Sequence, residues 1–218
     1  MTHYFDQKQN SEHAYRAFEA AWEGTLFRFT SDSGVFSRRQ VDDGTHLLVS
    51  TVLSCEADAP IQVLDLGTGI GVMAIALAGL RPSFRVLGSD INERAVSLAR
   101  RNASLNGVRN ASFLECDGVP VDGACEGEPV EGSAGKGARY DLIILNPPIR
   151  AGKETVYRLF REAREHLNDG GRFYIVIRVR QGAASAAKEL AGSFDIVETI
   201  NRGKGYHVIR ACVPKSGG

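Results

Sequence analysis

Nine consecutive residues decide the fold: Val63-Leu64-Asp65-Leu66-Gly67-Thr68-Gly69-Ile70-Gly71. The apolar run over residues 61–66 predicts a buried strand, and the apolar residues from Gly71 to Leu80 predict a helix. Three glycines at the junction allow a tight turn and the close approach of a ligand to the backbone. A strand, a glycine-rich turn and a helix in this order are the context of a nucleotide-binding site.

The spacing of the glycines separates two classes of cofactor. The pattern is G-x-G-x-G, and Val72 stands where the last glycine of a dinucleotide site would be. Asp65 places a carboxylate beside the turn, which suits the cationic amino group of S-adenosylmethionine (SAM) and would repel a pyrophosphate. The motif therefore favours SAM over a nicotinamide dinucleotide, and the alternative is a tight turn without a ligand.

Strand-like and helix-like segments alternate along the chain. Strands are predicted at residues 25–29, 61–66, 85–89, 111–115, 140–145, 172–177, 194–200 and 206–213, and helices at 9–22, 44–53, 71–80, 95–105, 156–167 and 183–190. Such alternation indicates an α/β, Rossmann-like fold with helices on both faces of a mostly parallel sheet. We expect seven strands in this sheet, closed by a C-terminal antiparallel hairpin whose turn lies at 201–205.

The 218 residues suit one domain, with 43% hydrophobic and 24% charged residues. We expect an N-terminal segment over 1–58 and a cofactor-binding core over 59–218. Residues 118–138 are rich in Gly and Glu and have no apolar periodicity, so we interpret them as a flexible surface insertion. The apolar stretches are too short to cross a bilayer, and no secretory signal is visible, which predicts a cytoplasmic protein without a membrane partner.

The cysteines, the histidines and the charge distribution bear on disulfides, metal sites and charged partners. The four cysteines form no CxxC pair and the five histidines are scattered, so we expect reduced thiols and no metal site. The net charge is zero, but residues 1–138 hold 12 basic and 18 acidic residues, whereas residues 139–218 hold 14 and 8. Such asymmetry marks either a face for an anionic partner or a chance placement of solvated charges.

Two more carboxylates follow predicted strands at the same edge of the sheet. Asp90 ends the strand over 85–89, at the position where a carboxylate bonds the ribose hydroxyls of a nucleotide. Its alternative role is to cap the next helix. Asp117 follows the third strand of the core, where its carboxylate and the backbone N–H of Gly118 suit the adenine ring, although a plain loop aspartate is the alternative.

The most specific signal is Asn146-Pro147-Pro148-Ile149, at the end of the strand over 140–145. Two prolines fix the backbone and remove two hydrogen-bond donors. The carbonyl of Pro147 and the amide oxygen of Asn146 can therefore point at one –NH2 group and orient its lone pair toward a methyl carbon. The alternative is a rigid loop without a catalytic role.

These motifs, in this order, resemble a class I SAM-dependent methyltransferase. More narrowly, the chain resembles the single-domain relatives of ribosomal RNA small subunit methyltransferase C, which share the methyltransferase-small domain. The segments that carry the resemblance are 27–30, 34–37, 43–45, 63–71, 90–95, 146–153 and 205–209. The resemblance implies that SAM is contacted by Asp65, Gly67, Thr68, Gly69, Gly71, Asp90, Ile91 and Asn146. It also suggests that Thr45 closes over the methionine end.

Two departures leave the acceptor open. Many amino methyltransferases have an aromatic residue after the two prolines to stack on the target base, whereas this chain has Ile149. The two-domain members also carry an extra N-terminal copy, for which this chain has only a short segment. Phe36 is a candidate for contact with a target base, with core packing as its alternative. Arg150 and Lys153 flank the motif and are candidates to hold phosphates.

Three functions remain open at this point. The first is methylation of guanine N2 in RNA, with ribosomal RNA or a ribosomal subunit as the partner. A second is methylation of a glutamine amide in a protein, which uses the same Asn-Pro-Pro arrangement. The third is a module that binds SAM or RNA without turnover, against which Asn146 and Asp90 argue. The oligomeric state is left open.

Overall fold

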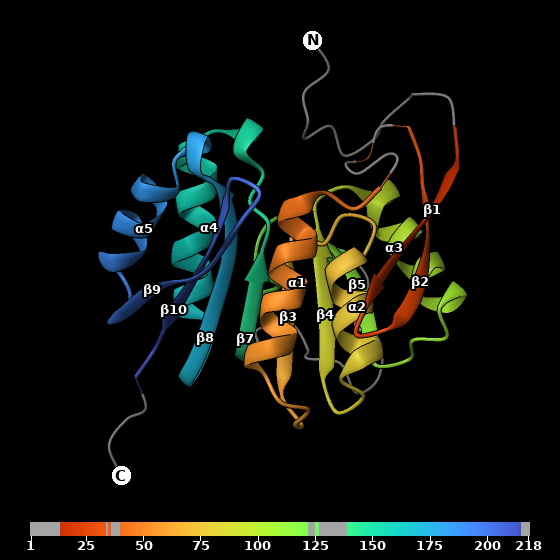
Figure 1. The fold of residues 1–218 in the computed structure, drawn as a ribbon, viewed down its shortest axis with the longest axis horizontal. Helices are drawn as coiled ribbons and strands as arrows, with labels where there is room; N and C mark the ends of the chain where they lie inside the picture. Colours follow the sequence, from red (N-terminus) through yellow and green to blue (C-terminus); the bar gives the residue numbers. More distant parts are fainter. Residues whose placement is uncertain (1–13, 34, 36–39, 122–124, 127–138, 215–218) are drawn as a thin grey trace.

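The computed structural model describes residues 14–33, 35, 40–121, 125–126 and 139–214. Its main sheet has eight strands in the order β6-β5-β4-β3-β7-β8-β10-β9 (Figure 1). The strands are β3 (Gln62–Leu66), β4 (Arg85–Asp90), β5 (Ala111–Cys116), β6 (Cys125–Glu126), β7 (Tyr140–Leu145), β8 (Leu167–Arg178), β9 (Ile196–Gly203) and β10 (Tyr206–Cys212). The predicted α/β fold is confirmed, with the two-residue strand β6 as an addition.

The order of the strands creates the site. The five strands from β5 to β8 are parallel, and β10 is antiparallel to both β8 and β9. From β3 the chain moves to β4 and β5 on one side, and then returns to β7 on the other side of β3. Such a switch point opens a crevice at the carboxyl ends of the strands, where ligands of open α/β sheets bind.

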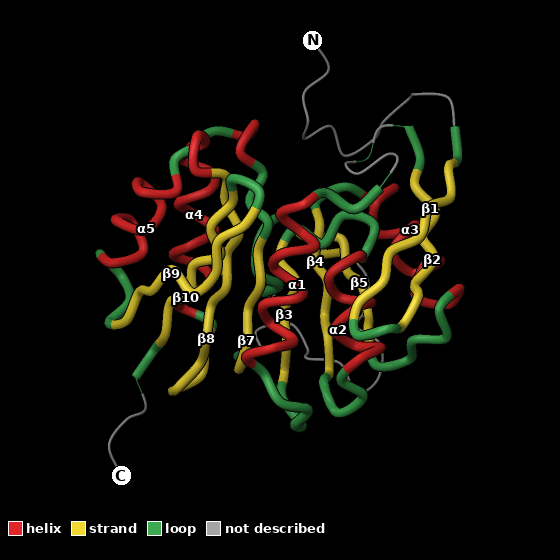
Figure 2. Tube along the Cα trace, in the orientation of Figure 1, coloured by secondary structure: helices red, strands yellow, loops and turns green. Residues whose placement is uncertain are grey.

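Helices cover both faces of the sheet, as Figure 2 shows. One core contains α1 (Asp43–Cys55), α2 (Val72–Leu80) and α3 (Glu93–Leu105), and the other contains α4 (Lys153–Glu165) and α5 (Ala183–Ala191). Val63 and Leu64, neighbours on β3, point into opposite cores, as the two-residue period of a strand requires. Two short 3-10 helices, η1 (Ile149–Ala151) and η2 (Val179–Gln181), follow β7 and β8.

The predicted helix over 9–22 is wrong where the structure describes it. Residues Arg16–Trp22 form strand β1, which pairs along its whole length with β2 (Thr25–Ser31). Glu23 and Gly24 form the turn with φ of 47° and 77°, the positive values that a tight hairpin turn uses. Alanines favoured a helix in the sequence, but Phe18 stacks on Phe29 across the hairpin, and this packing overrides the helix propensity.

Asn102 of α3 and Asn106, directly after this helix, bind the outer edge of β2. Asn106 accepts from the N–H of Arg28 at 2.9 Å and donates to its carbonyl at 2.7 Å, and Asn102 does the same to Thr30 at 2.8 and 3.1 Å. The pair is four residues apart and so lies on one face of the helix. These amides substitute for a third strand and fix the hairpin against the helical layer.

Three smaller predictions concern the insertion at 118–138, the turn at 201–205 and the division of the chain at residue 58. Within the predicted insertion 118–138, residues Cys125–Glu126 pair with β5, and most of the rest lies outside the described residues. The turn expected at 201–205 is shorter, because β9 continues to Gly203 and only Lys204 and Gly205 have positive φ. The division at residue 58 stays a prediction.

The expectation of four reduced thiols is wrong for Cys116, which takes part in a disulfide, whereas Cys55 and Cys212 are free. The backbone of Cys116 is paired with that of Cys125 by the β5–β6 ladder. Sequence spacing alone did not indicate this, because Cys116 and Cys125 form no CxxC motif and only strand pairing places their backbones opposite each other.

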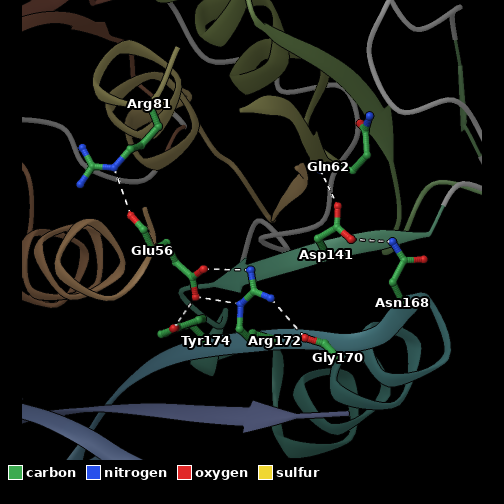
Figure 3. A network of polar contacts seen from close by, with 8 residues as sticks. All are labelled: Glu56, Gln62, Arg81, Asp141, Asn168, Gly170, Arg172 and Tyr174. Atoms are coloured by element: carbon green, nitrogen blue, oxygen red, sulfur yellow. Dashed lines mark hydrogen bonds and ion pairs between the residues drawn. The ribbon is translucent and has the colours of Figure 1, made fainter. Parts of the chain in front are cut away.

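A polar network holds the end of the sheet opposite the crevice (Figure 3). Glu56, directly after α1, accepts two hydrogen bonds of 2.8 Å from Arg172 of β8 and one of 2.7 Å from the hydroxyl of Tyr174. Arg81, after α2, donates to the backbone carbonyl of Glu56 at 3.1 Å. The carboxylate of Glu56 therefore ties the end of α1 to β8, and its backbone carbonyl joins the end of α2 to the same place.

We expect Glu56→Gln to lower the free energy of unfolding by about 3 kcal/mol, because Arg172 would stay largely buried without an opposite charge. The Glu56 and Arg172 side chains are only 10% and 27% exposed. Urea denaturation measures the change. As a matched control, Glu19→Gln removes the exposed pair of Glu19 with Arg28, whose side chains are 52% and 69% exposed. The control should change stability by less than about 1 kcal/mol. Equal losses in the two variants would contradict the assigned role of Glu56.

Candidate active site

A cavity of about 430 Å³ lies at the carboxyl ends of β3, β4, β5, β7 and β8. Its volume is within the range of ligand pockets. Most of the residues selected from the sequence line it: Thr45, Gly67, Thr68, Gly69, Asp90, Ile91, Asp117, Gly118, Asn146, Pro147, Pro148, Ile149 and Arg150. The motifs from four separate strand ends thus form one pocket.

The glycine-rich turn forms the floor of the cavity. Its backbone is held by the N–H of Thr68, which donates to the carbonyl of Ser89 at 2.8 Å on β4. Gly69 has a φ of 56°, and a Cβ at this position would meet no atom within 4 Å. Gly71, in contrast, packs away from the cavity, because a Cβ there would lie 3.0 Å from the side chain of Ala99. Gly69 thus leaves room for a ligand, whereas Gly71 lets α3 approach α2.

Asp65 lies beneath the turn and not in the cavity. The carboxylate is fully buried, and its Oδ2 accepts from the Thr68 hydroxyl at 2.7 Å and from the N–H of Ala74 at 3.0 Å. Asp65 is therefore not placed for the expected contact with the cationic amino group of SAM, because its side chain does not line the cavity. Burial raises the pKa of Asp65 to about 7, against the effect of these two hydrogen bonds. Asp65 holds the turn and the first turn of α2 together.

Asp90 ends β4 at the rim of the glycine-rich turn. Its Oδ2 accepts from the N–H of Gly69 at 2.8 Å, and its Oδ1 accepts from the N–H of Asn92 at 2.9 Å. The alternative role as a helix cap is wrong, since Asn92 is the residue whose side chain caps α3. Burial raises the pKa of Asp90, while the two backbone N–H groups act in the opposite direction.

Asp117 and Gly118 form the far end of the cavity beside α4. Asp117 is paired with Arg158 at 2.6 Å, and Arg158 also contacts Glu162 at 2.6 Å. Glu162 in turn accepts from the N–H of Val119 at 3.1 Å. Arg158 and Glu162 of α4 thus hold the loop that follows β5. Arg158 lines the cavity, although the sequence analysis did not identify it as a site residue.

Asn146 is held from one side by the start of α1. Its Nδ2 donates to Thr45 Oγ1 at 2.9 Å, and the Thr45 hydroxyl donates to Asp42 Oδ2 at 2.6 Å. Asp42 is the N-cap of α1 and accepts from the N–H groups of Gly44 and Thr45. Because Nδ2 is used in this chain of bonds, Oδ1 is the acceptor that Asn146 offers to a ligand.

The two prolines shape the backbone after Asn146. Pro148 has φ −74° and ψ 76°, and the N–H of Ile149 donates to the carbonyl of Pro147 at 2.8 Å, which together make an inverse γ-turn. The carbonyl of Pro147 therefore already accepts one hydrogen bond, and its second lone pair remains for a ligand. Pro147 is buried and Ile149 is partly exposed at the rim.

Sequence reasoning missed a further group of residues that line the cavity. It consists of Arg178 at the end of β8, Gln181 of η2 and Tyr206 at the start of β10. Asp42, Ser89 and Cys116 also line the cavity without having been selected. The only sequence signal for Tyr206 was its place in a matching segment, and no local motif marks the other five.

One candidate substrate residue, Lys153, does not line this cavity. Lys153, the first residue of α4, lines a separate shallow groove between α4 and α5, together with Tyr157 and Lys188. Phe36 lies outside the described residues.

Within the described ranges, no group of three or more His, Cys, Asp or Glu side chains is arranged to hold a metal ion. In the same ranges, no helix has the length and apolarity to span a bilayer.

A doubly wound sheet, a glycine-rich turn after β3 and an Asn-Pro-Pro motif after β7 define a class I SAM-dependent methyltransferase. The family model of the methyltransferase small domain matches residues 26–210. The chain therefore belongs to the methyltransferase small domain family, and its cofactor is SAM.

Named relatives extend this comparison. Uncharacterized protein YbxB of Bacillus subtilis (strain 168) is 36% identical over 210 residues, which cover 96% of this chain and 97% of that protein. Ribosomal RNA small subunit methyltransferase C of Klebsiella pneumoniae subsp. pneumoniae is 33% identical over 198 residues, which cover 88% of this chain and 53% of the relative. The chain thus spans about half the length of this second relative.

Solved structures agree with the fold. The T. thermophilus 16S rRNA N2 G1207 methyltransferase, in complex with AdoMet and guanosine, matches 91% of this chain and 50% of its own, with a TM-score of 0.76 and 26% identity. The ribosomal protein L11 methylase of Lactobacillus delbrueckii subsp. bulgaricus matches 81% of each chain, with a TM-score of 0.61 and 21% identity. The second similarity concerns the fold alone.

The raised pKa of Asp65 predicts how stability depends on pH. An unfolded Asp ionises near pH 4, whereas folded Asp65 ionises near pH 7, so the folded state binds more protons between these values. The free energy of unfolding should therefore fall as the pH rises from about 4 to about 7. Asp65→Asn keeps an acceptor for Thr68 and Ala74 and removes the titration. We expect the variant to gain stability relative to the parent protein between pH 5 and pH 8, as measured by urea midpoints.

The matched control for this experiment is Asp195→Asn, which changes an exposed aspartate just before β9. Its stability relative to the parent protein, measured over the same pH range, gives the effect of replacing a surface carboxylate. If the Asp65→Asn difference follows that of the control, the Asp65 carboxyl is not harder to ionise in the folded state.

Proposed function

We propose that this protein transfers the methyl group of SAM to the N2 amino group of a guanine in RNA, with small-subunit ribosomal RNA as the substrate. The observation that carries the proposal is the match over 91% of the chain to a 16S rRNA N2 G1207 methyltransferase in complex with guanosine. The name of the Klebsiella pneumoniae relative supports the same substrate class. The geometry of Asn146 supports an acceptor that carries an –NH2 group.

The described residues fit SAM on the cofactor side of the cavity. In this proposal, Gly67, Thr68 and Gly69 lie under the cofactor, where the open space beside Gly69 admits it. Asp90 has two lone pairs beyond its bonds to Gly69 and Asn92, and these accept from ribose hydroxyls. The remaining proposed contacts with SAM are Ile91, Asp117 and Gly118 around adenine and Thr45 at the methionine end.

On the acceptor side, the chain's own groups orient the nitrogen that is methylated. Bound SAM supplies a methyl group on a positively charged sulfur, which makes the methyl carbon electrophilic. Asn146 Oδ1 accepts one hydrogen of the –NH2 group, and the free lone pair of the Pro147 carbonyl accepts the other. The nitrogen lone pair then points away from both oxygens and toward the methyl carbon. Positioning of this kind can supply much of the acceleration of a two-substrate reaction.

The substrate assignment is tested with labelled SAM offered in parallel to free ribosomal RNA, small ribosomal subunits and a protein extract. We expect label in RNA, and hydrolysis of that RNA should yield N2-methylguanosine. Label in glutamine of a protein would refute the RNA substrate and leave the methyltransferase assignment in place. Binding of SAM without transfer to any of the three would favour a module without turnover.

We expect Asn146→Ala to reduce the single-turnover rate of methyl transfer by about 10²- to 10³-fold, the effect of removing one preorganised polar group. SAM affinity, measured by calorimetry, should change much less, because Oδ1 faces the acceptor. The matched control is Asn201→Ala, since the Asn201 amide also donates to a threonine hydroxyl, Thr51, at 2.8 Å but does not line the cavity. A near-normal rate in Asn146→Ala would refute the mechanism.

A further inference from the structure

The acceptor end of the cavity lacks an aromatic residue after the two prolines, because Ile149 occupies that position. An aliphatic side chain covers one face of a flat ring but offers it no π-surface. Another part of the lining pairs a cation with an aromatic ring. Among the described residues that line the cavity, Arg178 is the one cationic side chain that lies over an aromatic ring, that of Tyr206.

The position of Arg178 is fixed by strand pairing and by ring contact. Arg178 and Tyr206 are opposite each other in the antiparallel β8–β10 ladder. The guanidinium carbon lies 4.9 Å from the centre of the Tyr206 ring, within the range of a cation–π contact. Tyr206 itself is 9% exposed, whereas Arg178 is exposed at the rim. The Tyr206 ring thus contacts the guanidinium of Arg178, and both residues line the cavity.

Tyr206 is in turn held by the start of α1. A Cβ at Gly44 would lie 2.7 Å from Cε1 of Tyr206, so the ring packs directly on the backbone of this glycine. Gly44 also donates its N–H to Asp42, the residue that holds Thr45 and so Asn146. One short segment therefore positions both the amide that faces the acceptor nitrogen and the ring that supports Arg178.

Arg178 is charged and is not neutralised by a carboxylate. A hydrogen bond to the Tyr206 side chain raises the pKa of Arg178, and Asp42 and Asp43 act in the same direction. Within the described residues no carboxylate forms a salt bridge with Arg178, and the nearby Asp43 is paired with Lys204 at 2.6 Å.

We propose that Arg178, positioned by Tyr206, is the stacking surface for the acceptor guanine in the cavity that Ile149 also lines. This inference rests on the proposed function. RNA bases that are removed from a stack are commonly held on aromatic rings or on guanidinium planes. A planar, delocalised cation stacks on a base in a way that the compact ammonium of lysine does not. The specificity for a flat base then comes from a residue distant from the Asn-Pro-Pro motif.

The decisive variant is Arg178→Lys, which keeps the charge and removes the plane. With a guanine-containing RNA that the parent protein methylates, KM should rise about 10-fold or more, as expected for the loss of one base-stacking contact. Arg178→Ala should behave like Arg178→Lys. The kcat at saturating RNA and the Kd for SAM should each stay within about threefold of the parent values. The Kd for RNA, measured without SAM, should rise together with KM.

Two comparisons complete the test. Tyr206→Leu removes the ring and should raise KM, with circular dichroism to verify folding. Tyr206→Phe keeps the ring and removes only the hydroxyl that hydrogen-bonds Arg178, so its KM should rise less than that of Tyr206→Leu. Arg180→Lys changes a neighbouring arginine of η2 that does not line the cavity and should have no effect on KM.

Three results would overturn the inference. A parent-like KM for Arg178→Lys with a raised KM for Arg178→Ala would assign Arg178 to phosphate binding. Parent-like values in both variants would assign it no role in acceptor binding. A weaker Kd for SAM with an unchanged RNA KM would place Arg178 on the cofactor. If the parent protein methylates no guanine in any RNA, the proposed function has failed instead.

Discussion

The buried carboxylate of Asp65 is the interaction on which the site depends. It joins the end of β3 to the Thr68 hydroxyl in the turn and to the N–H of Ala74 in α2. The strand, the turn and the helix are therefore fixed relative to one another. From the opposite side, Asn102 of α3 donates to the carbonyl of Ile70 at 3.0 Å. A turn bound on both sides keeps its shape without a ligand. The cofactor floor is therefore largely formed before SAM arrives, and less ordering entropy is lost on binding.

The two halves of the cavity are built by different kinds of contact. The cofactor half uses contacts over shorter sequence separations, as in the bond from the N–H of Gly69 to the carboxylate of Asp90, 21 residues away. The acceptor half depends on contacts between distant segments, as in the bond from Asn146 to Thr45, which lie 101 residues apart. The antiparallel partner of β8 adds Tyr206 from yet another part of the chain. The acceptor half can therefore differ between proteins while the floor stays the same.

This division explains what the sequence could predict. The glycine-rich turn and the Asn-Pro-Pro motif are local patterns, so their places at the edge of the sheet were predictable. The direction of the Asp65 side chain was not, since it depends on which N–H groups the next helix presents. Arg178 and Gln181 belong to no local motif, and the contact of Arg178 with Tyr206 depends on the pairing of β8 with β10. The strand at 16–22 was mistaken for a helix for a similar reason: its pairing with β2 outweighs the propensity of its alanines.

Asn102 and Asn106 have a consequence for self-association. Strand β2 belongs to a sheet of only two strands, and an uncovered strand edge is a template for pairing with another molecule. Asn102 and Asn106 occupy the N–H and carbonyl groups of Arg28 and Thr30 with their own amides. A neighbouring molecule would have to displace four hydrogen bonds before it could add a strand there. The same helix that borders the cofactor turn thus also guards the protein against aggregation through its hairpin.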